Sequence, residues 1–436
     1  AADQSARKDF EGSDLIVAEE QTVSYGNPTL RFTHRTARVT VVLTDYTEGL
    51  ASVRLTGLST EGGNPAEIAP YDKGGDTYTA LVAPQSVAAG TAFITCAFNN
   101  GKVFVYKMQK AAEWKAGEEY TYTVSLAAAK DPGYTVSEDG KTYTVYNANG
   151  LLAWNEAVQK DMTLNCTLTA DITLTGEWTP IGTESQPYTG TFDGGGKYTI
   201  TGLKIDQSGT DYVGLIGRLG SGGKVQDVTL TEVNVTGGTY VGGIAGQNDG
   251  TVENCSVNGT VTGRGFNDTG GIVGTNYGTI SGCSAEGTVT GSVNVGGIAG
   301  GSYLGVTIVG CYSSAAVEGY STVGGVVGNL GNNSSLMASY STGNVTVTST
   351  TGYAGGVVGV NAQGTVTACY HATGTVSGQG NVGGIVGMNN SGQNTACYWS
   401  SNPANGIGKM DSGTNGTIKV DGTVTWQTAV DAMNTA

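Results

Sequence analysis

Cysteine is the residue type in this sequence whose spacing most suggests chemistry. The first three members of a regular row are 28 residues apart, and serine takes one of the later places. Regularly placed thiols could form disulfides, bind a metal ion or line a core. The row consists of Cys255, Cys283, Cys311, Ser339, Cys369 and Cys397.

Disulfides and metal binding explain this row poorly. The sequence has no CxxC pair, and its only histidines are His34 and His371, so a metal site lacks the usual ligand spacing. Side chains stacked in a column have parallel Cβ vectors, which suit disulfide geometry badly. We therefore expect a structural column of small buried side chains, with disulfides as the second interpretation, and we expect no metal or cofactor.

A tyrosine follows four places of the same row. Neighbouring residues on a strand face opposite ways, so inward-pointing cysteines would leave these rings exposed. The rings could stack and stiffen the structure, or they could form an aromatic surface that binds a sugar or a protein partner. The residues before the cysteines are small or turn-prone, and a bend there would reverse the assignment. The four tyrosines are Tyr312, Tyr340, Tyr370 and Tyr398.

These rows belong to a repeat with a glycine-rich core, such as "VGGIAG" at 241–246 and "VGGVVG" at 323–328. The last glycines of successive cores are 26 to 31 residues apart, which indicates a solenoid. Each unit holds short β-type runs between glycine and asparagine, so we predict three short strands per turn in a right-handed parallel β-helix. The last glycines are Gly217, Gly246, Gly274, Gly300, Gly328, Gly359 and Gly387.

A different pattern precedes the repeats. Residues 14–126 hold alternating runs such as "RVTVVL" (38–43) and "AFITCAF" (92–98), with turn signals such as "EGGNP" (61–65). Short strands at this spacing predict an antiparallel β-sandwich. The chain is therefore predicted to be all-β.

Two short helices are expected to cap the β-helix. The stretches 147–159 and 423–434 each combine tryptophan with helix formers, and the open ends of a β-helix need covering. We predict five segments: a β-sandwich at 1–128, a linker at 129–133, the first β-helix segment with its capping helix at 134–212, the repeats at 213–400 and a C-terminal cap at 401–436.

Charge and hydropathy exclude several classes of function. The formal net charge is −15, and no basic face is visible, so nucleic acid is not an expected partner. No apolar run approaches the roughly 18 residues of a membrane-spanning helix.

Catalysis is not indicated either. Parallel β-helices house polysaccharide lyases and hydrolases, whose sites combine clustered carboxylates with basic residues. Between Val225 and Ser400 the only basic side chain besides histidine is Arg264, and the acidic residues are scattered over different repeats. The HExxH pattern of zinc peptidases is absent. We therefore predict that the protein is not an enzyme.

The run from 168 to 217, with "LTADITLTGEWTPIG" and "YTGTFDGGGKYTITGLKI" before "YVGLIG" and the repeated "VGGIAG" units, resembles the GLUG-repeat family of bacterial surface proteins. The resemblance covers about 134–400. It implies extracellular display, as in adhesin-like proteins, and the family also occurs as an accessory region in some immunoglobulin A metallopeptidases.

The N-terminal region resembles the second β-sandwich of fimbrillin-like proteins of Gram-negative anaerobes, in the segments 30–43, 78–98 and 114–126. The resemblance implies that a first sandwich is missing and that the chain is part of a longer precursor. Polymerising fimbrillins donate a C-terminal strand to the next subunit. This chain ends in a β-helix instead, which favours a tip or surface-anchored role over that of a shaft subunit.

We therefore expect a non-enzymatic adhesion or fimbria-associated protein on the surface of a Gram-negative bacterium, either anchored to the outer membrane or associated with a fimbria. The expected partner is a host glycan, a matrix protein or another fimbrial subunit, bound at Tyr312, Tyr340, Tyr370 and Tyr398. The alternatives are a carbohydrate-active β-helix enzyme or glycan-binding module, and a purely structural pilus component.

Overall fold

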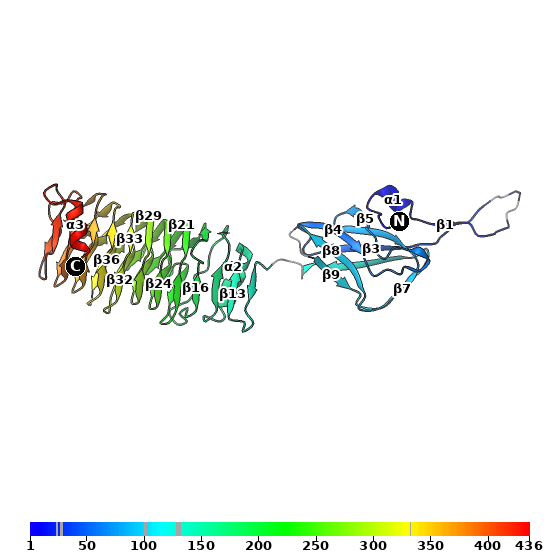
Figure 1. Ribbon diagram of the computed structural model, residues 1–436, viewed down its shortest axis with the longest axis horizontal. Coiled ribbons are helices and arrows are strands. Elements are labelled where there is room, and N and C mark those ends of the chain that lie inside the picture. Colours follow the sequence, from blue (N-terminus) through cyan, green and yellow to red (C-terminus); the bar gives the residue numbers. More distant parts are fainter. Residues whose placement is uncertain (23–24, 27–28, 100–102, 128–131, 332) are drawn as a thin grey trace. The chain divides into compact units, whose positions relative to one another are not determined.

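The computed structural model describes residues 1–436 except 23–24, 27–28, 100–102, 128–131 and 332. The chain forms two compact units, Ala1–Asp131 and Pro132–Ala436. Most of the linker predicted at 129–133 lies outside the described residues. Figure 1 shows both units.

The N-terminal unit is a β-sandwich of a four-stranded and a three-stranded sheet, with strand orders β11-β3-β6-β5 and β4-β8-β9. Strand β3 alternates buried and half-buried side chains, as a strand with one face on a core must. The strands are β3 (Ala37–Thr44), β4 (Leu50–Leu55), β5 (Tyr71–Gly74), β6 (Thr77–Val82), β8 (Ala92–Phe98), β9 (Val103–Lys107) and β11 (Glu119–Ser125).

One strand pair of the sandwich differs from the antiparallel prediction. Strand β11, the last long strand of the unit, runs parallel to β3, its first long strand. The other pairs in these two sheets are antiparallel. Between the sheets, the rings of Phe93 and Trp114 lie 5.5 Å apart, and Trp114 Nε1 donates to the Tyr122 hydroxyl at 2.9 Å.

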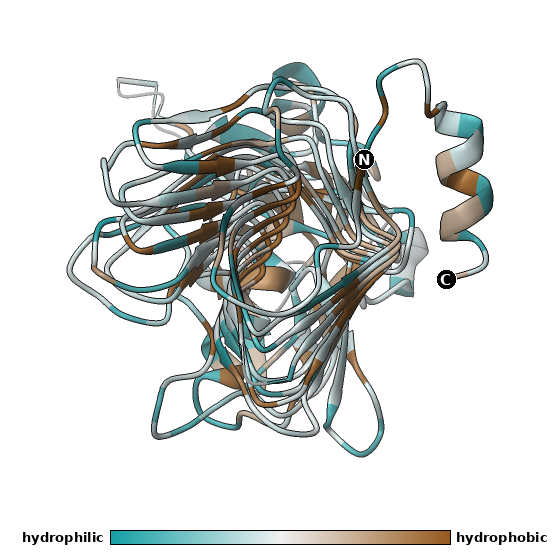
Figure 2. Cartoon of the chain, turned by 90° about the vertical axis from the view of Figure 1, so that its left-hand side faces the viewer, coloured by the Kyte–Doolittle hydropathy of each residue, from teal (hydrophilic) through white to brown (hydrophobic). Residues whose placement is uncertain are grey.

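The second unit is a β-solenoid of about 8 turns from residue 166 on. Its strands form long sheets of 11, 14, 8 and 6 strands (Figures 1 and 2). They stack in parallel except for the antiparallel pair of β12 (Tyr134–Val136) and β13 (Thr142–Val145) at the start. One turn consists of β22 (Val241–Gly242), β23 (Ala245–Asn248), β24 (Thr251–Glu253) and β25 (Ser256–Gly263), and β26 (Thr269–Gly270) starts the next. This turn therefore has four strands instead of the predicted three, because the glycine core bends between β22 and β23. In later turns the counterpart of β25 is divided into two strands, as in β33 (Tyr312–Ser313) and β34 (Ala316–Gly319).

The first glycine of each core permits this bend. A Cβ atom built on that glycine would lie 1.9 to 2.2 Å from the carbonyl oxygen three residues later in the chain, which no side chain can tolerate. The approach recurs in six turns, at Gly242, Gly270, Gly296, Gly324, Gly355 and Gly383. The high glycine content is thus a requirement of the folded-back core.

Helix α2 (Ala148–Val158) closes the N-terminal end of the solenoid. The Asn147 side chain accepts a hydrogen bond from Gly150 N and caps the helix. Leu151, Trp154 and Val158 are fully buried in the solenoid core. The predicted N-terminal cap therefore forms through an apolar helix face that continues the core.

Helix α3 (Trp426–Met433) forms where a second capping helix was predicted, but it packs along the side of the stack. Among its residues only Ala429 is buried, and its Trp426 contacts Tyr370. Figure 2, which looks onto the C-terminal end of the solenoid, shows α3 beside the coils. The helix thus contacts the side of the solenoid through the Tyr370–Trp426 ring pair.

The solenoid interior also accepts polar side chains where they find partners. Ser313, Ser341, His371 and Trp399 follow one another at the same inward position of successive turns. His371 is fully buried, its Nδ1 lies 2.8 Å from Ser341 Oγ, and no described group bonds its Nε2. Burial lowers the pKa of His371 to about 4.

The glycine constraint predicts that Gly355→Ala destabilises the solenoid by about 3 kcal/mol, because the new methyl group would lie 1.9 Å from Val358 O. Gly209→Ala is the matched control, since a Cβ atom there meets nothing within 4 Å. We expect its effect to stay below about 1 kcal/mol. Thermal melting monitored by circular dichroism measures both variants, and equal melting temperatures would contradict this explanation.

Buried His371 predicts a loss of stability in mild acid. Its pKa in the folded chain is about 4, below the ordinary 6.5, so the unfolded chain binds the proton more tightly. Stability should therefore fall as the pH drops from 6.5 towards 4, by up to about 3 kcal/mol. Melting curves across this range should show a smaller decrease for His371→Ser, whereas His34→Ser, in the other unit, should keep the wild-type decrease. If His371→Ser loses as much stability between pH 6.5 and 4 as the wild type, His371 is not the cause of the loss.

Candidate functional site

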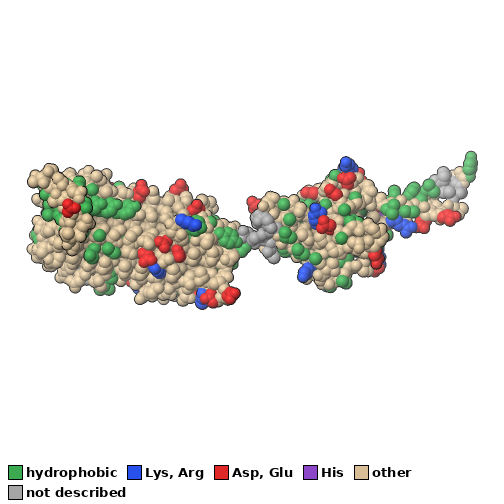
Figure 3. All heavy atoms as spheres, viewed as in Figure 1, with side chains coloured by type: hydrophobic (Ala, Val, Ile, Leu, Met, Phe, Trp, Pro, Cys, Tyr) green, Lys and Arg blue, Asp and Glu red, His purple; other side chains and the backbone are tan. Residues whose placement is uncertain are grey.

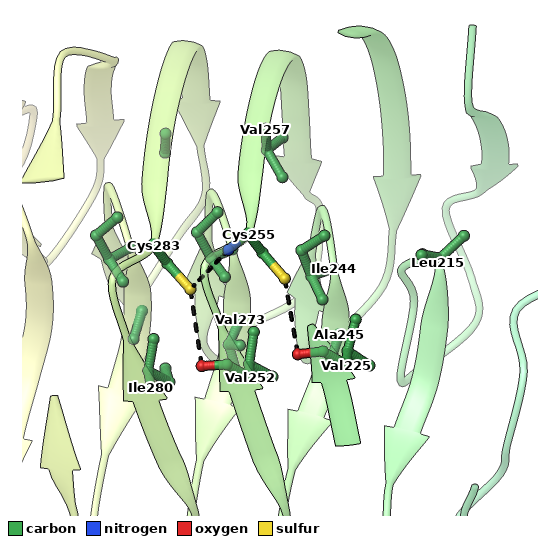
Figure 4. Packing of buried hydrophobic residues seen from close by; sticks show 14 of the residues in the cluster. Leu215, Val225, Ile244, Ala245, Val252, Cys255, Val257, Val273, Ile280 and Cys283 are labelled. Carbon is green, nitrogen blue, oxygen red and sulfur yellow. Dashed lines mark hydrogen bonds between the residues drawn. The ribbon is translucent and has the colours of Figure 1, made fainter. Parts of the chain in front are cut away.

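The cysteine row forms a column inside the solenoid. Cys255, Cys283, Cys311, Cys369 and Cys397 are each at most 1% exposed. Figure 4 shows two of them pointing into the coil, where Cys255 Sγ contacts Val225 O and Cys283 Sγ contacts Val252 O, both at 3.7 Å. All described cysteines are free, so the column contains no disulfide.

Serine fits the column because its hydroxyl makes the same backbone contacts as the thiols. Cys255 N donates to Cys283 Sγ at 3.4 Å, and Cys283 Sγ donates to Ser281 O at 3.3 Å. Two turns later, Cys311 N donates to Ser339 Oγ at 3.1 Å, and Ser339 Oγ donates to Met337 O at 2.7 Å. The side chain at this position thus links backbone groups at a bend.

The chain bends at the residue immediately before each column residue. Asn254, Gly282, Ala338, Ala368 and Ala396 all have φ between 47° and 61°, a left-handed conformation that costs a non-glycine residue about 1–2 kcal/mol. The bend still leaves the cysteines inside. Burial raises the pKa of Cys397 to about 11, so little thiolate exists at neutral pH. The column is suited to packing rather than to nucleophilic or metal chemistry.

Three of the four tyrosines stack on the outer face of the solenoid. Tyr312, Tyr340 and Tyr370 occupy paired positions in β33 (Tyr312–Ser313), β38 (Tyr340–Ser341) and β43 (Tyr370–His371). The ring centroids of Tyr312 and Tyr340 are 5.2 Å apart at 8°, and those of Tyr340 and Tyr370 are 4.6 Å apart at 3°. We call these three residues the tyrosine ladder.

The fourth tyrosine does not extend the accessible ladder. Tyr398, in β48 (Cys397–Trp399), is only 3% exposed. Its neighbour Tyr370 instead meets the edge of the Trp426 ring, at a centroid distance of 5.6 Å and an angle of 65°. The chain after the last repeat folds back here: β50 (Thr417–Lys419) pairs with β48, and α3 packs beside Tyr370. Sequence reasoning did not place Trp426 next to the ladder, because it assigned this helix to the end of the stack.

The surroundings of the ladder are nearly free of charge. Tyr312 is 43% exposed, and Tyr340 and Tyr370 are half-buried. Figure 3 shows a strip of hydrophobic side chains next to α3, on a solenoid surface with few charged groups. An aromatic strip in uncharged surroundings can bind a partner through apolar contact and hydroxyl hydrogen bonds.

The described residues show no assembled catalytic or metal site. Ser341 and His371 form a pair, but both side chains are buried, so a substrate cannot reach them. The structure as described contains no group of three or more His, Cys, Asp or Glu residues that could hold a metal ion. None of the described helices has the length and apolar character needed to cross a membrane.

A second aromatic pair was missed in the sequence. Tyr212 and Tyr240 stack at 5.0 Å and 22°, on a different part of the solenoid from the ladder. Both precede the glycine core of their repeat, in "YVGLIG" and "YVGGIAG". Comparing the residue before each core would have revealed this pair.

Comparison with known families agrees with this architecture. Residues 1–138 match the family model described as fimbrillin-like. Residues 237–262 and 267–290 each match the GLUG motif. These matches confirm both resemblances seen in the sequence.

Individual relatives share only parts of the chain. Halomucin of Haloquadratum walsbyi is 31% identical over 205 residues, which is 41% of this chain but 2% of Halomucin. The chain therefore matches a very small part of that relative's length.

Several solved structures resemble parts of the chain, at TM-scores that support no functional conclusion. A Bacteroides ovatus crystal structure provisionally named as an immunoglobulin A1 protease has a TM-score of 0.48 and 21% identity, with 64% of this chain and 86% of that chain covered. A structure named IgA1 Protease has a TM-score of 0.42 and 14% identity, with 87% and 29% covered. A fimbrial protein from Bacteroides ovatus has a TM-score of 0.19 and 21% identity, with 32% of each chain covered.

The chain thus combines an N-terminal fimbrillin-like domain with a β-solenoid that carries GLUG motifs.

Proposed function

We propose that the protein is a non-enzymatic adhesin or fimbria-associated protein of the bacterial cell surface, and that its solenoid presents the tyrosine ladder to a protein partner. The fimbrillin-like match supports a surface or fimbrial location. The scattered acidic residues and the closed Ser341–His371 pair support a role without catalysis.

The observation that carries the proposal is the stacking geometry of the ladder. Both faces of the Tyr340 ring are occupied by neighbouring rings, at 5.2 and 4.6 Å. A ligand can therefore reach the ring edges and hydroxyl groups of the ladder. A strip of edges and hydroxyls suits an extended protein surface better than a sugar, which needs a free ring face.

The stiffness of the solenoid contributes to the proposed function. Each strand pairs with the strands of the turns before and after it, so the ladder residues keep a fixed spacing. A partner that matches this spacing loses little conformational entropy of the solenoid on binding. The proposed partner is another fimbrial subunit or a host matrix protein, and the fimbrillin-like domain favours the fimbrial subunit.

The test is a Tyr340→Ala/Tyr370→Ala double variant. We expect its affinity for the partner to fall at least about tenfold, since stacked aromatic side chains dominate such interfaces. Tyr320→Ala is the matched control, because Tyr320 is 61% exposed in the same part of the solenoid but lies outside the ladder. Surface plasmon resonance against isolated fimbriae, collagen, fibronectin and laminin measures binding of both variants and the wild type.

Two outcomes would count against the proposal. Equal binding by the wild type and the double variant would exclude the ladder as the contact surface. Absence of binding to any of these partners would favour a purely structural role, in which stacking only stiffens the solenoid. Tyr340→Phe/Tyr370→Phe separates the two roles further, because it keeps the stacked rings and removes the hydroxyl groups.

A further inference from the structure

A pocket of about 210 Å³ lies in the first turns of the solenoid, remote in sequence from the tyrosine ladder. Its walls come from Gln159 at the end of α2, from the loop after Trp178 and from the loop between β18 (Lys204–Gln207) and Tyr212. The lining residues that matter here are Thr179, Pro180, Glu184, Gln207, Asp211 and Tyr212.

One face of the Tyr212 ring is available to this pocket. Val213 pairs with Val241, so Tyr240 stacks on Tyr212 from the following turn. Ile181 pairs with Ile216, so the neighbouring Pro180 belongs to the preceding turn. The pocket therefore lies on the side of Tyr212 opposite to Tyr240, in contrast to Tyr340, whose two faces are both covered.

The backbone holds Tyr212 in a fixed position. Its φ is 58°, its N–H donates to Thr239 O at 3.0 Å, and Asp211 Oδ1 accepts from Thr239 N at 3.1 Å. A Cβ atom on Gly217 would lie 2.7 Å from Tyr212 O, which shows how closely the chain packs behind the ring. A ring fixed in this way loses little entropy when a ligand stacks on it.

Polar groups with free hydrogen-bonding capacity line the pocket together with Tyr212. Among the described residues, nothing bonds the Glu184 carboxylate, the Gln207 amide or the Thr179 hydroxyl, and Asp211 Oδ2 is also free. Carboxylates and amide oxygens accept hydrogen bonds from hydroxyl groups. An aromatic face next to several acceptors is the usual chemistry of a pocket for a polyhydroxylated ring.

The charge of the pocket selects among such rings. Glu184 and Asp211 line it, and no described basic side chain does. The neighbouring Arg218 is held by Asp249 at 2.9 Å and donates to the backbone oxygen of Glu184 at 3.1 Å. Acidic sugars would meet uncompensated negative charge here.

We infer that this pocket binds one neutral pyranose residue of a glycan. The C–H face of the sugar stacks on Tyr212 beside Pro180, and its hydroxyl groups donate to Glu184 and Asp211. The volume is smaller than the roughly 300 Å³ at which pockets for drug-sized ligands begin, so it suits a single ring. This site is independent of the tyrosine ladder and does not rest on the proposed function.

The experiment is saturation-transfer NMR on the full chain with methyl glycosides of glucose, galactose, mannose and N-acetylglucosamine. Glucuronic acid, N-acetylneuraminic acid and spermidine serve as anionic and cationic probes. We expect transfer to at least one neutral glycoside, at least tenfold weaker binding in Tyr212→Ala and in Glu184→Gln/Asp211→Asn, and unchanged binding in Tyr340→Ala. Tyr212→Trp keeps an aromatic face and should retain binding.

Three results would overturn the inference. They are the absence of transfer to every neutral glycoside, wild-type binding by Tyr212→Ala, and stronger binding of the acidic sugars or of spermidine than of any neutral glycoside. If Tyr212→Ala does not fold, two other variants test the inference. Glu184→Gln/Asp211→Asn should weaken glycoside binding, and Tyr212→Trp should retain it. Because Tyr340→Ala is the control here, failure of this site and failure of the ladder proposal can be told apart.

Discussion

The close backbone approach at the glycine core is the constraint on which the solenoid depends. At Gly324 and Gly355 a Cβ atom would lie 1.9 Å from a carbonyl oxygen of the same turn, so only glycine lets the chain fold back there. Because the bend recurs in six turns, the other positions of these turns recur in register as well. The cysteine column and the tyrosine ladder both follow from this register, since a single residue inserted into one turn would move its side chains to the opposite faces.

The same register explains why the interior tolerates polar residues. Ser339 replaces cysteine because its hydroxyl bonds the same kind of backbone groups as the thiols do. Buried Asn248 donates to Asn276 Oδ1 at 2.7 Å, one turn further on, and Asn276 donates to Ser302 Oγ at 3.2 Å. A stacked polar side chain finds its partner in the next turn, so the cost of burying it is largely offset. The interior position is thus constrained by hydrogen-bonding pattern and size more than by hydrophobicity.

The features that recur in every repeat could be predicted from the sequence. The features at the ends of the repeat region, or within a single unit, could be predicted less well. The period, the parallel solenoid and the fimbrillin-like sandwich are confirmed, since each rests on a pattern present many times. The extra bend at the glycine core was missed because "VGGIAG" reads as one continuous strand. The burial of Tyr398 was missed because Tyr398 pairs with β50, which lies beyond the repeats and has no periodic signal. The pocket beside Tyr212 joins two loops from different turns, so no local pattern could reveal it.

The residue before the glycine core differs between turns, so the open face at Tyr212 does not recur in the two turns after Tyr240. Tyr212 and Tyr240 hold this position in two turns, and Asp268 and Asn294 hold it in the next two. There Asp268 accepts from Thr275 Oγ1 at 2.6 Å and from Asn294 Nδ2 at 2.7 Å, and Tyr303 lies over Gly301, where a Cβ atom would be 2.4 Å from its hydroxyl oxygen. In these later turns, hydrogen-bonded side chains occupy the place that corresponds to the open space beside Tyr212. One backbone repeat therefore carries two aromatic surfaces of different chemistry: a ladder whose faces are used internally, and a single ring whose face is free.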